Sequence, residues 1–207
     1  MNPREQSVRH LANLFTVVVG LGLSAAIYNF VDPNGRVLPF LPTTFILCIA
    51  YVATLLPFYH GAMRHLDDRH ASATAGTLND GALLADFIIL FIEGCWFIAL
   101  GALVNQPIRF VQGYALLMAV DVGWGVLAHL AFAQRGASRA ELRWAAINFF
   151  TAALLFGLMQ YYDIVPWMTT GSPQNITKCA LTICGIAILR TALDYMLTWR
   201  LYFPLQA

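Results

Sequence analysis

The stretch LLADFIILFIEGCWFIALGALV, from Leu83 to Val104, decides the class of fold. It is long enough to cross about 30 Å of hydrocarbon as an α-helix, which needs about 20 residues. Its only charged residues are Asp86 and Glu93, which lie seven positions apart and therefore on one face of a helix. The stretch predicts a transmembrane helix with a carboxylate-bearing face.

Similar apolar blocks lie on both sides of this stretch along the whole chain. Hydrophobic residues make up 59% of the 207 residues and charged residues only 11%, against roughly 25% charged in a soluble domain. We therefore predict an all-α fold, a polytopic membrane helical bundle of six transmembrane helices that forms a single membrane-embedded domain. The predicted spans are 9–31, 39–62, 82–104, 108–133, 143–166 and 178–203.

The arginines predict the direction in which the chain is inserted. Most of them lie before the first span, between the second and third, between the fourth and fifth, and at the end of the sixth. They are Arg4, Arg9, Arg64, Arg69, Arg135, Arg139, Arg143 and Arg200. Because basic residues accumulate in cytoplasmic loops, both termini are expected to be cytoplasmic. We expect a multi-pass protein of the inner (plasma) membrane, with the lipid bilayer as its surroundings.

Composition also excludes several classes of protein. The formal net charge of +1 argues against nucleic acid as a partner. All the loops are short, and none contains a glycine-rich phosphate loop, so ATP-driven chemistry within this chain is not expected.

Five charged residues lie at depth inside the predicted spans, away from the span ends: Asp86, Glu93, Asp121, Arg190 and Asp194. Each charge in the bilayer centre costs roughly 2.5–3.5 kcal/mol on insertion scales, so these side chains are expected to face one another across the third, fourth and sixth helices. Four acids against one arginine leave an excess of carboxyl groups, which protons, water or cations must compensate. This pattern indicates a channel or transporter for a small cation or proton, lined by buried carboxylates.

The second span ends in PFYHGAMRHLDDRH, Pro57–His70, which is rich in groups that bind metals or protons. On a continuous α-helix, His60, Arg64 and Asp67 share one face, which we expect to form the cytoplasmic mouth of the path. His65, Asp68 and His70 are expected to point into solvent. Because the spacing matches no common metal site, neither a metal nor another cofactor is predicted.

Other functions stay open at this stage. His10, His60 and His129 fall at similar depths and could hold a haem or a metal if they faced one another. His60, Asp86 and Asp194 could serve as acids and bases in an enzyme that acts on lipid headgroups at the cytoplasmic leaflet. A third alternative is a structural subunit of a membrane complex, in which the polar residues only fix packing.

The start of the first span, RHLANLF from Arg9 to Phe15, carries a family resemblance. Together with six spans in about 200 residues and cytoplasmic termini, it resembles the bacterial six-helix relatives of the lysosomal potassium channel. Their signature at this place is Arg-x-x-x-Phe-Ser-Asp, of which this chain has the arginine and a polar residue but not Phe-Ser-Asp. The resemblance implies a tetrameric cation channel, and hence a homo-oligomer.

Overall fold

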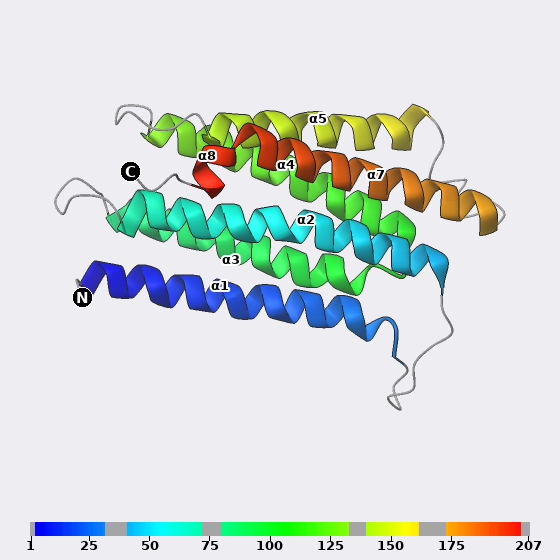
Figure 1. The fold of residues 1–207 in the computed structure, drawn as a ribbon, viewed down its shortest axis with the longest axis horizontal. Helices are drawn as coiled ribbons and strands as arrows, with labels where there is room; N and C mark the ends of the chain where they lie inside the picture. The colour runs from blue at the N-terminus through cyan, green and yellow to red at the C-terminus, as the bar shows by residue number, and fades with distance from the viewer. Residues whose placement is uncertain (1–2, 32–40, 72–79, 133–139, 162–172, 204–207) are drawn as a thin grey trace.

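The computed structural model describes residues 3–31, 41–71, 80–132, 140–161 and 173–203. These residues form six long helices, a π-helical segment and one short C-terminal helix (Figure 1). The elements are α1 (Pro3–Tyr28), α2 (Pro42–Leu66), η1 (Asp67–Ala71), α3 (Asp80–Ala102), α4 (Pro107–Phe132), α5 (Ala140–Tyr161), α7 (Pro173–Leu197) and α8 (Trp199–Tyr202).

The prediction of an all-α bundle with six membrane-spanning helices is confirmed. Six helices are long and apolar enough to cross a bilayer. Four of the six begin at a proline, Pro3, Pro42, Pro107 and Pro173. Proline suits the first helical position because its missing N–H would have no intrahelical partner there.

The predicted sixth span, 178–203, is too long at its C-terminal end. α7 ends at Leu197, and α8 begins at Trp199 after a bend at Thr198. The Thr198 hydroxyl donates to the carbonyl oxygen of Asp194 at 2.5 Å, and the Thr198 backbone N–H donates to the same oxygen at 3.0 Å. This bend directs α8 back against the bundle.

The helices lie side by side along one axis, and the described ends of the chain, Pro3 and Phe203, lie at the same end of the bundle (Figure 1). We call this the terminus end and the opposite one the far end. α1 packs mainly on α3, α2 on α7, and α4 on α5. The assignment of the terminus end to the cytoplasm stays a prediction.

Glycines allow the close contact between α1 and α3. A Cβ atom added to Gly101 would collide with the carbonyl oxygen of Gly22 and lie 3.2 Å from the backbone nitrogen of Ala26. A Cβ added to Gly22 would lie 3.3 Å from backbone atoms of α3. The two backbones can therefore approach only because both positions lack a side chain.

Pro57 lies inside α2 and has no backbone N–H, so the carbonyl oxygen of Ala53 loses its usual helical donor. The Thr191 hydroxyl of α7 supplies the missing donor, with a bond of 2.6 Å to that oxygen. One turn further on, the Tyr202 hydroxyl of α8 lies 3.2 Å from the carbonyl oxygen of Pro57. The proline thus creates an acceptor through which α7 is joined to α2.

Apolar and polar side chains are divided between the two halves of the bundle. The main apolar core lies in the far half and the middle, with Leu47, Tyr51, Phe97, Leu100 and Phe110 fully or almost fully buried. The buried charged side chains lie from the middle to the terminus end. Every charged group discussed below is therefore concentrated in one half of the membrane's thickness.

Candidate functional site

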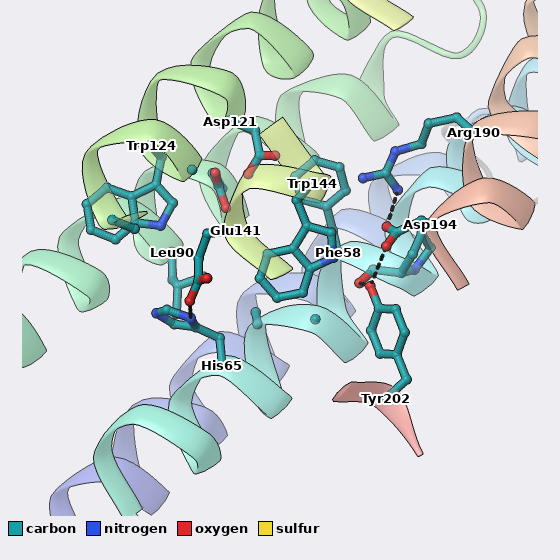
Figure 2. A pocket seen from close by; sticks show the side chains of 16 residues that line it. Phe58, His65, Leu90, Asp121, Trp124, Glu141, Trp144, Arg190, Asp194 and Tyr202 are labelled. Atoms are coloured by element: carbon teal, nitrogen blue, oxygen red, sulfur yellow. Dashed lines mark hydrogen bonds and ion pairs between the residues drawn. The ribbon is translucent and has the colours of Figure 1, made fainter. Parts of the chain in front are cut away.

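A small cavity lies at the centre of the terminus half, enclosed by α2, α3, α4, α5, α7 and α8 (Figure 2). Its volume is about 50 Å³. A water molecule requires about 10–15 Å³ on this measure, so the cavity has room for roughly three to five waters. Titratable side chains from five of these helices line it, namely His65, Glu93, Asp121, Glu141, Arg190 and Asp194.

Glu93 and Asp121 form a carboxyl pair near the middle of α3 and α4. The carboxyl groups of Glu93 and Asp121 lie close enough to interact; Glu93 is 4% exposed, and Asp121 is half-buried. An ionised carboxylate can only accept hydrogen bonds. The two carboxyl groups can therefore hydrogen-bond to each other only when one of them carries a proton.

Asn148 of α5 connects this pair to Arg190 of α7. Its side-chain amide donates to Asp121 Oδ2, and its carbonyl oxygen accepts from Arg190 Nε at 2.9 Å. The Arg190 guanidinium also lies 4.7 Å from the centre of the Phe58 ring. A neutral amide, rather than direct contact, thus joins the acid to the arginine.

Asp194 lies one helical turn beyond Arg190, and the two form the ion pair expected from their spacing, at 3.2 Å. Asp194 Oδ1 accepts a hydrogen bond from the Tyr202 hydroxyl at 3.0 Å and also lies 3.0 Å from the hydroxyl oxygen of Thr198. Burial, and then the charge of Asp194, raises the pKa of Tyr202. Tyr202 is therefore held as a neutral donor where α8 covers the cavity (Figure 2).

The structure thus brings together four of the five predicted charged residues: Glu93, Asp121, Arg190 and Asp194 all line the cavity. Asp86 does not line this cavity, so the expectation that all five side chains would face one another is wrong for Asp86. Its carboxylate lies instead against two histidines, described below.

The predicted mouth residues do not line the cavity. His60 is half-buried and packs against α8, with 4.6 Å between the centres of its ring and that of Tyr202. Arg64 Nε donates to the carbonyl oxygen of Leu201 at 2.9 Å. The side chain of Asp67 is 62% exposed and lies 3.8 Å from Arg64. His60 and Arg64 therefore hold α8 in place, and Asp67, which was expected to face the bundle, faces outward.

His65 and His70, predicted to be solvated, are buried, so that prediction is wrong. The Nε2 atoms of His65 and His70 lie 3.1 Å and 2.6 Å from the same oxygen, Oδ2 of Asp86, which is itself fully buried. His65 lies in the α-helical part of α2 and faces Asp86 of α3 and Glu141 of α5. For His70 the physical reason is the π-helical segment η1, which begins between the two histidines. A π-turn bonds residues five apart rather than four, and it brings His70 toward the side of His65.

Glu141 and Arg69 were not predicted as site residues. Glu141 is 3% exposed at the first turn of α5, and the guanidinium of Arg69 pairs with its Oε1. The same oxygen lies 3.9 Å from His65 Nδ1. Both residues lie outside the predicted spans, and the ion pair between Arg69 of η1 and Glu141 of α5 is a contact between helices that the sequence does not reveal.

The structure gives different surroundings to the three histidines considered for haem. His10 is exposed on α1, His60 packs against Tyr202, and His129 is half-buried on α4. Arg9, on which the family resemblance partly depends, is exposed on α1. In comparisons with protein-family models, with curated proteins and with solved structures, nothing matches this chain.

Proposed function

We propose that this integral membrane protein translocates protons, which it binds at the Glu93–Asp121 carboxyl pair. The observation that carries the proposal is this pair near the middle of the bundle, with Glu93 buried and Asp121 half-buried, facing a cavity with room for a few waters that lies toward the terminus end. In this reading Glu93 and Asp121 hold the proton, and Arg190 and Asp194 set the local charge.

The balance of charge supports a bound proton. Around the inner part of the cavity, Glu93, Asp121 and Asp194 face one arginine, Arg190. If all four were ionised, two negative charges would remain uncompensated, each costing roughly 2.5–3.5 kcal/mol at the membrane centre. A shared proton removes one of them. The second negative charge is neutralised when a further proton binds and returns when that proton leaves. Transport requires this cycle of binding and release.

The size of the cavity favours a proton over larger substrates. Sites for small organic molecules usually measure about 300–1,000 Å³, whereas this cavity measures about 50 Å³. A lipid headgroup does not fit into that space. Waters in the cavity would link the carboxyl pair to Glu141 and Tyr202, which also line it.

The position of the cavity favours a carrier over an open pore. Toward the far end, the described side chains between the helices are mostly apolar, including Leu47, Phe97 and Phe110. Among the described residues, these packed apolar side chains separate the pair from the far end. Translocation therefore requires the helices to rearrange so that the pair opens to the other side, as in alternating access.

The proposal is tested by proton flux in liposomes. The purified protein is reconstituted with a pH-sensitive dye inside, and a potassium gradient with valinomycin provides the driving voltage. We expect voltage-driven acidification with the wild type and a return to the rate of protein-free liposomes with Glu93→Gln or Asp121→Asn. Glu5→Gln, which changes an exposed carboxylate on α1, is the matched control and should retain the wild-type rate.

Circular dichroism and gel filtration establish that each variant is folded before its flux is compared. Wild-type flux in folded Glu93→Gln and Asp121→Asn proteins would refute the proposal. A flux that follows sodium or potassium but leaves internal pH unchanged would replace the proton by a small metal cation. The absence of any flux in every folded protein would favour the structural-subunit alternative.

A further inference from the structure

We propose that His65, His70 and Asp86 form a binding site for a divalent transition metal, with Zn²⁺ as the best-fitting ion. The site is separate from the carboxyl pair of the proposed proton path. It lies toward the terminus end, where α2 and η1 pack beside α3.

The donor atoms converge in the way that a metal site requires. His65 Nε2, His70 Nε2 and a carboxylate oxygen of Asp86 all lie within 4.8 Å of one another. Zinc bonds of about 2.0–2.2 Å in tetrahedral geometry place neighbouring donor atoms about 3.4 Å apart. The two observed N–O separations are 3.1 Å and 2.6 Å. A metal would therefore need only small side-chain rotations that move the donors slightly apart.

The local fold explains why these three residues meet. In an α-helix, positions five apart point about 140° away from each other. The change to π-helical geometry at Asp67–Ala71 reduces that angle and places His70 near His65. Single π-turns are frequent at functional sites because they redirect a side chain in this way.

Burial and unpaired atoms point to a missing cation. Asp86 is fully buried, and no lysine or arginine in the described ranges forms an ion pair with it. Its Oδ1 atom and the Nδ1 atom of His70 are buried without a hydrogen-bond partner among the described residues. A buried carboxylate needs a compensating positive charge, and a divalent ion between it and the imidazoles supplies one.

The neighbours of the histidines also suit a metal site. A histidine that ligates a metal usually directs its other ring nitrogen toward a carboxylate or carbonyl, which fixes the ring. His65 Nδ1 faces Glu141 Oε1 at 3.9 Å, and Arg69 in turn holds Glu141. Two imidazoles and one carboxylate form the ligand type of three-ligand zinc sites, which leave a fourth position for water.

The first test measures metal content. The full chain is purified with an affinity tag that lacks histidines, stripped with EDTA, loaded with Zn²⁺ and passed through a desalting column. We expect about one Zn²⁺ per chain by mass spectrometry in the wild type. His70→Ala and Asp86→Asn should bind Zn²⁺ at least about tenfold more weakly in competition with a chromophoric chelator.

The matched control is His60→Ala, which removes a histidine of the same helix that lies outside the cluster and should retain wild-type affinity. Co²⁺ gives a readout that needs no variant, because tetrahedral nitrogen and oxygen ligands produce visible absorption. We expect such bands with the wild type, and their loss when Zn²⁺ is added. Wild-type protein that retains no more Zn²⁺ than His70→Ala and gives no Co²⁺ bands would overturn the proposal, leaving a hydrogen-bonded His–Asp–His cluster.

Discussion

The hydrogen bond from Thr191 to the carbonyl oxygen of Ala53 allows a prediction that isolates the effect of one proline. Thr191→Val keeps the shape of the side chain but removes the donor of the 2.6 Å bond. Interhelical hydrogen bonds in membrane proteins contribute about 0.6 kcal/mol on average and about 1.7 kcal/mol at most. The short bond and the absence of a backbone donor from Pro57 place this case near the upper end. We expect a loss of about 1–1.5 kcal/mol in the free energy of unfolding.

Thr191→Val should have almost no effect on the free energy of unfolding when it is made together with Pro57→Ala. Alanine at position 57 restores a backbone N–H, which can bond to the Ala53 oxygen as in a regular helix. In that background we expect Thr191→Val to cost less than about 0.5 kcal/mol, so the coupling energy between the two positions is about 1 kcal/mol. The carbonyl group at position 57, which faces Tyr202, is unchanged by the substitution.

The measurement is equilibrium unfolding in mixed micelles, with increasing SDS and detection by tryptophan fluorescence and circular dichroism. Thr182→Val is the matched control on α7, because the Thr182 hydroxyl is exposed and bonds only within its own helix, to Lys178 at 3.1 Å. It should change the free energy of unfolding by no more than about 0.5 kcal/mol. An equal loss for Thr191→Val with and without the proline would refute the reasoning.

Two further predictions concern helix packing and pH. Gly101→Ala should destabilise the protein by about 1–3 kcal/mol in the same unfolding assay, because the new Cβ would collide with the Gly22 carbonyl of α1. Gly123→Ala is the control, because a Cβ added to Gly123 has no neighbouring atom within 4 Å. Equal losses of stability in the two variants would contradict this account. Because the pKa of Tyr202 is raised in the folded state, its contribution to stability is complete below the unfolded pKa of about 10 and is lost as pH rises above that value. Between about pH 9 and 11 the wild type should therefore lose more stability than Tyr202→Phe, and parallel pH curves would show that Tyr202 is not responsible.

The helices could be predicted from the sequence because each is specified by local features. The length of the apolar blocks gives the number of spans, and prolines at positions such as Pro42 and Pro107 mark where helices begin. The ion pair of Arg190 and Asp194 was predictable for the same reason, since their spacing alone places them on one face of a helix.

The partners of Asp86 could not be predicted in this way. The position of His70 was assigned on the assumption of continuous α-helical geometry, and a change of five residues to π-helical geometry reverses the result. His65 lies in α2 before this change, and its burial depends on contacts with α3 and α5. The burial of Glu141 depends on how η1 packs against α5, which no spacing within one helix reveals. Similarly, the amide of Asn148 connects Asp121 to Arg190 through contacts between three helices.

The confinement of the buried charged groups to the middle and the terminus half of the bundle has an electrical consequence. Water and polar side chains conduct or polarise far better than packed hydrocarbon, so a transmembrane voltage falls mainly across the far, apolar half. The carboxyl pair of Glu93 and Asp121 then lies near the potential of the terminus end, although it is near mid-depth. One elementary charge that crosses the remaining thickness moves through almost the full field, about 2.3 kcal/mol per 100 mV. The transfer of a charge from this site to the far side would thus depend on membrane potential nearly as strongly as transfer across the whole membrane.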